Sequence, residues 1–256
     1  MNIIINSKTN ILSCEGEGGA HELALYSPEA FTILSREWLR VGWALRYYHT
    51  FSWLGRPILQ LPDDLLRVQE VICSNRPDAI IETGVFDGGS LLFHATICEA
   101  LGNGRVIGVD KFVSDDTRAA LRNNRLSERI ALVEGDSTDP HTVDQVKKLL
   151  PGSGSVMVIL DSNHTADHVK RELELYAPLV TAGSYIVAAD GVMRDLTDVP
   201  GGDPTWADDN PAAAARAFAH DHPEFELRQP DWKVHDSPLT GNVTYWADGW
   251  LRRKPE

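Results

Sequence analysis

The sequence has little of what would indicate secretion, membrane insertion or nucleic-acid binding. Only three cysteines occur among 256 residues (Cys14, Cys73 and Cys98), and their spacing matches neither a metal motif nor a redox pair. Lys and Arg number 24 against 37 Asp and Glu, and the net charge of −13 disfavours a phosphate-rich partner. No apolar run reaches membrane-spanning length, and the first residues lack the basic start and long apolar stretch of a signal peptide. These absences predict a cytoplasmic protein that binds neither nucleic acid nor membrane.

The features that are present belong to an α/β domain. Apolar residues make up 43% of the chain and charged residues 24%, as in ordinary globular proteins. Short β-rich runs alternate with helical segments along 79–83, 105–110, 130–136, 155–161 and 183–190. This alternation, with two further strands near the C-terminus, predicts a Rossmann-like doubly wound, mostly parallel sheet of about seven strands with helices on both faces.

Residues 1–60 form an extension that we expect to be helical. Ser27 is a plausible N-cap and Pro28 occupies the first turn of a segment with helical spacing. The extension also carries an unusual aromatic load, namely Trp38, Trp43, Tyr47, Tyr48 and Trp53. Because rings of this kind are usually covered by packing or by another subunit, we predict a homo-oligomer, a dimer or a tetramer.

Each of the five predicted parallel strands ends at an acidic residue. These residues are Glu82, Asp110, Asp136, Asp161 and Asp190. One such acid is unremarkable, because Asp often caps the following helix. Ligands of open α/β sheets, however, bind beyond the carboxyl ends of the strands. Five acids there favour a binding cleft, with helix capping as the alternative.

The loop after the first strand, "ETGVFDGGS" (82–90), combines glycines with acids. Gly84 allows a tight turn and a close approach to a ligand. Glu82 and Asp87 flank the loop without any Lys or Arg inside it, so a pyrophosphate would face carboxylates. A ligand with positive charge and ribose hydroxyls fits better. S-adenosylmethionine, which has an ammonium, a sulfonium, a ribose and an adenine, is the best match.

The residues expected to bind this cofactor follow the strand ends. Asp110, 21 residues after Gly89, is placed to accept hydrogen bonds from both ribose hydroxyls. Asp136 and Ser137 are placed to hold the adenine amino group. The complete expected set is Glu82, Gly84, Asp87, Ser90, Asp110, Lys111, Asp136, Ser137 and Asp161.

Several stretches resemble the cephalosporin hydroxylase/rhamnosyl O-methyltransferase group. They are "IIETGVFDGGSLLF", "VIGVD", "EGDS", "ILDSNHTADHVKRELELYAPLV" and "NVTYWADGWLRR", across about residues 60–253. The resemblance implies that residues 61–256 form a class I S-adenosylmethionine-dependent methyltransferase domain. It also implies methylation of a hydroxyl, on a deoxysugar of a glycosylated secondary metabolite such as an antibiotic.

The stretch "VMVILDSNHTADH" (156–168) supplies the expected chemistry. Asp161 and Asp190 end adjacent strands, so both carboxylates can point into one cleft as ligands of Mg²⁺. The metal would orient an acceptor hydroxyl and lower its pKa, and His164 would take the proton as general base. Asp161 and His164 are therefore the predicted catalytic residues. His168, four residues further on, is expected to be a helix residue that faces solvent or lies behind the groups that contact the ligand.

The resemblance also exposes a departure from the family pattern. Relatives with a metal site place an acid immediately before the aspartate that ends the fifth strand, where this sequence has Ala189. Either His164, Asp195 or water completes the metal shell, or metal binding is weakened or absent.

The acceptor side is predicted from two segments and from His164. The loop 191–211 is expected to lie outside the core as a lid. Trp232 and His235 are expected to contact a sugar, with a partly buried core position as the equal alternative for Trp232. Two other functions stay open. One is a dinucleotide-dependent oxidoreductase, which the acid-rich glycine loop disfavours, and the other is a non-catalytic, cofactor-binding family member, suggested by Ala189.

Overall fold

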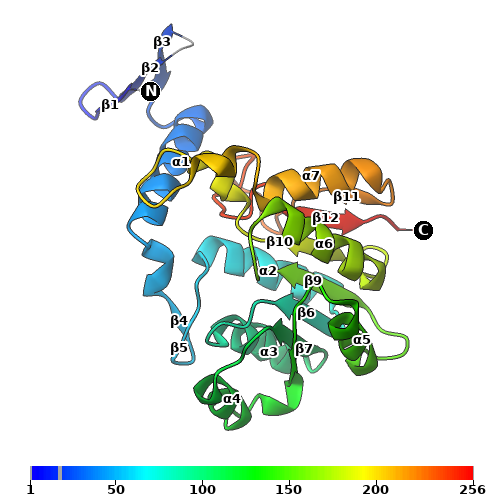
Figure 1. The fold of residues 1–256 in the computed structure, drawn as a ribbon. Helices are drawn as coiled ribbons and strands as arrows, with labels where there is room; N and C mark the ends of the chain where they lie inside the picture. Colours follow the sequence, from blue (N-terminus) through cyan, green and yellow to red (C-terminus); the bar gives the residue numbers. More distant parts are fainter. Residues whose placement is uncertain (1, 17–18, 256) are drawn as a thin grey trace.

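A seven-stranded sheet organises the computed structural model, which describes residues 2–16 and 19–255 (Figure 1). The strand order is β11-β12-β10-β9-β6-β7-β8, and within this sheet only β12 runs antiparallel to its neighbours. The strands are β6 (Ala79–Thr83), β7 (Arg105–Asp110), β8 (Ile130–Glu134), β9 (Val156–Leu160), β10 (Tyr185–Ala188), β11 (Phe225–Leu227) and β12 (Trp250–Arg253). The predicted doubly wound, mostly parallel sheet is confirmed.

Helices cover both faces of this sheet, so its central strands are apolar on both sides. On one face lie α2 (Pro62–Asn75), α3 (Gly89–Leu101) and α4 (Asp115–Arg122), packed with Ile80 and Met157. On the other lie α5 (Pro140–Leu149), α6 (Ala166–Tyr176) and α7 (Pro211–Asp221), packed with Ile81 and Val158. Consecutive strand residues therefore enter opposite layers of the core. None of the described helices has the length and apolar character needed to cross a bilayer.

The strand order reverses between β6 and β9, and the loops after these strands meet there. Gly84 follows β6 with φ of +90°, a left-handed conformation that glycine adopts without cost. Its backbone lies so close to Asp161, the residue after β9, that any side chain at position 84 would collide with the Asp161 carbonyl oxygen. This contact brings the glycine loop and the acid after β9 to one point, where doubly wound sheets bind ligands.

The N-terminal extension contains the predicted helix and a small sheet that was not predicted. Helix α1 (Pro28–Ala44) begins as expected, with the Ser27 hydroxyl accepting a hydrogen bond from the Ala30 N–H at 3.2 Å. Before it, β1 (Asn2–Asn6), β2 (Ile11–Gly16) and β3 (Gly19–Ala24) form an antiparallel sheet beside the start of α1, away from the central sheet (Figure 1). Leu12 and Cys14 pack there against α1. The expectation of a helical extension is therefore wrong for residues 2–16 and 19–24. Each of these three short strands needs a neighbouring strand to satisfy its backbone hydrogen bonds, and this pairing cannot be read from one segment of the sequence.

The C-terminal half of α1 forms ion pairs with the segment that follows β10. Arg36 pairs with Asp195 at 2.9 Å, and Arg40 pairs with Asp198 at 2.9 Å. This segment, expected to be a lid outside the core, buries Leu196 and contains the 3₁₀ turns η4 (Gly191–Asp195) and η5 (Pro204–Ala207). The lid expectation is wrong for its first half, because apolar side chains at residues 192–196 enter the core.

The aromatic surface of the extension divides into two parts. Trp43, Tyr48 and Trp53 pack against the main core. Trp38 of α1 keeps 45% of its surface exposed, and Leu45, the residue that follows the helix, is 76% exposed. We predict from this remaining apolar strip that light scattering shows a dimer or a larger oligomer, because such a surface is usually covered in solution. Replacing both Trp38 and Leu45 with serine should reduce the measured mass. A wild-type mass of 28.3 kDa would contradict the prediction.

Candidate active site

Two adjoining cavities open at the carboxyl ends of the parallel strands. The larger has a volume of about 450 Å³, and its wall includes Gly84, Ser90, Asp110, Asp161, His164 and Asp190. The smaller, of about 130 Å³, shares Gly84 and Asp110 with it and adds Lys111, Ser137 and His168. Most of the residues predicted from the strand ends therefore meet in one place, which only the sheet topology could bring about.

Asp110 stands between the two cavities and fastens the glycine loop. Its Oδ2 accepts hydrogen bonds from the Val85 N–H at 2.8 Å and the Phe86 N–H at 3.3 Å. Its Oδ1 accepts from the Phe112 N–H at 3.2 Å. A carboxylate oxygen has more than one acceptor site, so Asp110 can still receive donors from a bound ligand. The geometry is compatible with its predicted role toward a ribose.

Polar groups surround the smaller cavity. The Ser137 hydroxyl lies 3.2 Å from His168 Nε2, and the Ser162 hydroxyl lies 3.1 Å from the same nitrogen while donating to Glu172 Oε1 at 2.7 Å. His168, predicted only as a supporting helix residue, thus contributes directly to the wall. The periodicity of α6 could not reveal this contact, because Ser137 belongs to the loop after β8, 31 positions earlier in the chain.

Three predicted cofactor contacts lie outside both cavity walls. Glu82 is fully buried beneath the site, with Oε2 3.2 Å from His94 Nδ1. Asp87 pairs with Arg56 at 3.2 Å. Asp136 accepts hydrogen bonds from Thr138 and pairs with Lys111 at 3.0 Å, and these contacts lower its pKa to about 2. Contrary to prediction, these three carboxylates bind other side chains of the protein and do not line a cavity.

Asp161, His164 and Asp190 form a cluster on the wall of the larger cavity. One ligand atom from each lies within 4.8 Å of the others, and His164 Nε2 is 3.6 Å from Asp190 Oδ2. Burial, followed by the carboxylates of Asp190 and Glu82, raises the pKa of Asp161 well above its usual value. Burial also raises the pKa of Asp190, and His164 opposes that shift. The cluster therefore concentrates negative charge that a cation would offset.

The donor set of this cluster fits a divalent cation. Two carboxylate oxygens and one imidazole nitrogen are ordinary ligands for such an ion. Ala189 is buried in the core and supplies no ligand atom. Asp195, the other group considered from the sequence, is engaged by Arg36 and Arg194 at 2.9 and 3.5 Å. Among the described residues, His164 is therefore the third group of the cluster, beside the two carboxylates.

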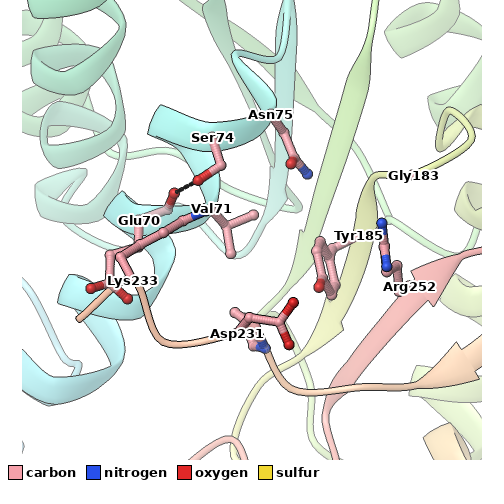
Figure 2. A pocket seen from close by; sticks show the side chains of 10 residues that line it. Glu70, Val71, Ser74, Asn75, Gly183, Tyr185, Asp231, Lys233 and Arg252 are labelled. Atoms are coloured by element: carbon pink, nitrogen blue, oxygen red, sulfur yellow. Dashed lines mark hydrogen bonds between the residues drawn. The ribbon is translucent and has the colours of Figure 1, made fainter. Parts of the chain in front are cut away.

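Trp232 and His235 line neither cavity. The Trp232 ring lies under the Arg67 guanidinium of α2, 5.1 Å from its centroid, and the His235 ring lies 5.2 Å from Trp232. Their loop borders a separate hollow of about 140 Å³ beside Tyr185 and Arg252, near the amino end of β10 (Figure 2). Both residues thus lie outside the walls of the cavities that contain Asp110 and Asp161, unlike His164, the other residue predicted for the acceptor side.

Sequence reasoning missed several residues of the larger cavity. They are Trp43, Tyr48, His49, Gln60 and Phe86. Gln60 is buried and donates from Nε2 to Asp161 Oδ2 at 3.0 Å, so it orients a predicted catalytic carboxylate. The aromatic load near residue 43 was a visible signal, but it was assigned to packing because nothing local connects it to residues more than 100 positions away.

A family model described as rhamnosyl O-methyltransferase/CmcI matches residues 45–254. The chain belongs to this family. It is accordingly an S-adenosylmethionine-dependent O-methyltransferase, as the resemblance implied, and the oxidoreductase alternative is left without support.

Individual relatives agree with the rhamnosyl O-methyltransferase/CmcI assignment. The chain is 33% identical over 155 residues to the rhamnosyl O-methyltransferase of Mycobacterium leprae (strain TN), covering 60% of this chain and 66% of the relative. It is 29% identical over 184 residues to that of Mycobacterium tuberculosis (strain ATCC 25618 / H37Rv), covering 69% and 71%. The aligned part thus spans about two thirds of these relatives.

A solved structure of CmcI shares the fold. That structure contains Mg and S-adenosylmethionine, and it superposes with a TM-score of 0.53 at 19% identity. The match covers 80% of this chain and 77% of CmcI. The likeness confirms the methyltransferase fold predicted from the order of strands and helices.

We predict that Asp110→Ala weakens the binding of S-adenosylhomocysteine by at least about tenfold, because charge-assisted hydrogen bonds are lost. Isothermal calorimetry measures the affinity. Asp87→Ala is the matched control, since that carboxylate belongs to the same loop but pairs with Arg56 outside the cavity wall. Equal affinities for the Asp110 variant and the wild type, both folded, would remove Asp110 from the cofactor site.

Proposed function

We propose that this enzyme methylates a hydroxyl of a deoxysugar carried by a glycosylated secondary metabolite, with a divalent cation such as Mg²⁺ and with His164 as general base. The observation that carries the proposal is the meeting of Asp161, His164 and Asp190 in the cavity that also contains Gly84 and Asp110. Two relatives named rhamnosyl O-methyltransferase support the sugar, and the CmcI structure with Mg and S-adenosylmethionine supports both cofactors.

The two cavities suit the two ends of the methyl donor. S-adenosylmethionine supplies an activated methyl group on a sulfonium sulfur. Ser137, Lys111 and His168 offer polar contacts for the adenosine end in the smaller cavity. Asp110 reaches both cavities from between them. Within residues 2–16 and 19–255, no Lys or Arg lines the larger cavity, so a sulfonium there meets carboxylates and no competing cation.

The same charge pattern restricts the acceptor. Asp110, Asp161 and Asp190 face the larger cavity, and a phosphate or carboxylate on the acceptor would be repelled by them. A nucleoside-diphosphate sugar fits this wall poorly, whereas a neutral glycoside fits well. We therefore place methylation after the sugar has been transferred to its metabolite.

Asp161 and Asp190, with His164 beside them, would hold the metal ion. When bound, a divalent cation lowers the pKa of a nearby hydroxyl and orients it. Gln60 keeps Asp161 in place through its hydrogen bond at 3.0 Å. His164 Nε2, 3.6 Å from Asp190, takes the proton of the acceptor hydroxyl, and the adjacent carboxylate stabilises the resulting imidazolium. The remaining contribution of the protein is alignment of the oxygen with the methyl group.

We further propose a cytoplasmic location and a homo-oligomeric state. The cysteines Cys14, Cys73 and Cys98 are free, which suits a reducing compartment. The exposed apolar strip of α1 supports self-association.

We expect His164→Ala to lower turnover by roughly 10²–10⁴-fold, the usual contribution of a positioned general base. S-adenosylhomocysteine affinity should stay close to that of the wild type, because the imidazole faces the acceptor. Raising the pH should restore part of the turnover, since hydroxide takes over the proton. The exposed His220, replaced by alanine, is the control. Full activity of the His164 variant would show that the histidine is not the base.

Chelation tests the metal half of the proposal. Treatment with EDTA should abolish turnover, and added Mg²⁺ should restore it in the wild type but not in Asp161→Ala. Calorimetry should show Mg²⁺ binding that Asp161→Ala loses. If the His164→Ala variant binds Mg²⁺ as tightly as the wild type, then His164 is not a metal ligand, as expected for a general base. Wild-type activity that survives EDTA would contradict the metal requirement and leave the base assignment standing.

A further inference from the structure

We infer that Trp43, Tyr48 and His49, from the end of α1 and the 3₁₀ turn η1 (Tyr47–Thr50), form the wall that binds the acceptor sugar and determines its specificity. This acceptor wall rests on the proposed function and assigns a substrate-binding role to a segment outside the methyltransferase sheet. All three residues line the larger cavity, which also contains Asp161, His164 and Asp190.

The acceptor wall lies next to the reacting cluster. Tyr48 and His49 line the same cavity as Asp190 and His164. A sugar that stacks on these rings would therefore present its hydroxyls toward the carboxylates and His164. Cofactor contacts lie on the other side, around Asp110 and the smaller cavity.

The rings of the acceptor wall are held in fixed orientations by their neighbours. Trp43 and Tyr48 lie 5.2 Å apart with an interplanar angle of 32°. Tyr245 packs edge-on against both, at 5.5 Å from Trp43 and 5.9 Å from Tyr48. Tyr245 is itself buried, and its backbone N–H donates to Asp64 at 2.9 Å. A surface built in this way needs little ordering when a ligand binds.

The position of the acceptor wall is tied to the segment that begins at Asp190. Arg36 and Arg40 of α1 pair with Asp195 and Asp198, a few residues after that carboxylate. Trp206, in the same segment, packs edge-on against Trp43 at 6.0 Å. The sugar-facing rings and a carboxylate of the catalytic cluster are thus positioned by one set of contacts.

The chemistry of the acceptor wall matches a pyranose. Aromatic faces pack well against the C–H face of a sugar, and the polar edges of Tyr and His reach hydroxyls. Tyr48 and His49 both line the cavity, and a phenol hydroxyl and an imidazole can each hydrogen-bond a sugar hydroxyl. Phe86, 59% exposed, adds an apolar side chain from the glycine loop. The cavity therefore offers rings and hydrogen-bonding groups but no basic side chain among the described residues.

Steady-state kinetics test the acceptor wall on the full-length enzyme. A panel of neutral 4-nitrophenyl glycosides, including the α-L-rhamnoside, identifies an acceptor by a mass gain of one methyl group. With that glycoside, Tyr48→Ala and Trp43→Ala should each raise KM by about five- to tenfold, as expected for loss of one aromatic contact, with kcat changed less than about twofold. Tyr48→Phe should recover most of the loss because it keeps the ring.

Two controls separate binding of the acceptor from general damage. Trp38→Ala removes a ring from the same helix that contacts Tyr47 and does not line the cavity, so its KM should equal that of the wild type. The Tyr48 and Trp43 variants should bind S-adenosylhomocysteine with the affinity of the wild type, as measured by calorimetry. That result would show that both variants are folded.

Three results would overturn the acceptor wall. An unchanged KM in the folded Tyr48→Ala and Trp43→Ala variants refutes it and leaves methyl transfer to glycosides intact. Loss of S-adenosylhomocysteine binding in folded Tyr48→Ala refutes it by placing the ring in the cofactor site. Failure of the wild type to methylate any glycoside of the panel refutes the proposed function, and the acceptor wall with it.

Discussion

The backbone of Gly84 lies against the carbonyl oxygen of Asp161, and this contact joins the two halves of the sheet at their carboxyl ends. It exists because β6 and β9 are neighbours in space although 72 residues of chain separate Thr83 from Val156. Only glycine fits at position 84, since the conformation is left-handed and no Cβ can be accommodated. The cavities, the acid cluster and the Asp110 contacts to the glycine loop all depend on this junction.

The electrostatics of the larger cavity favour ligands with positive charge. Asp161 and Asp190 face one another in a buried setting, with Gln60 as a neutral hydrogen-bond donor to Asp161. Carboxylates in such surroundings are costly to ionise unless a cation lies nearby. A sulfonium and a divalent cation both meet that requirement. The methyl donor and the proposed metal ion would thus meet the same electrostatic requirement.

Segments far from the sheet complete the larger cavity. Trp43 and Tyr48 come from the extension, and Tyr245, which packs against both rings, comes from the chain just before β12. Arg40 and Asp198 connect the extension to the segment after β10. Without these segments, the side of the cavity that Trp43 and Tyr48 line would be open.

The sequence by itself determined the strands, the acids at their ends and the start of α1. These features are local: β-branched runs, a following Asp and the Ser27-Pro28 cap can be recognised within a few residues. The strand-end rule then indicated correctly that Asp110, Asp161 and Asp190 would share one edge.

Only the tertiary structure decided which of the acids line a cavity. Glu82 turns inward to His94, and Asp87 pairs with Arg56 of the short strand β5 (Arg56–Pro57), 31 positions earlier. Trp232 packs under Arg67 of α2, whereas Tyr48 reaches the cavity. Periodicity reports which residues are apolar, but it carries no information on the partner that a side chain meets across the fold. That partner, through burial and charge, decides whether a carboxylate or a ring is structural or is free to bind a substrate.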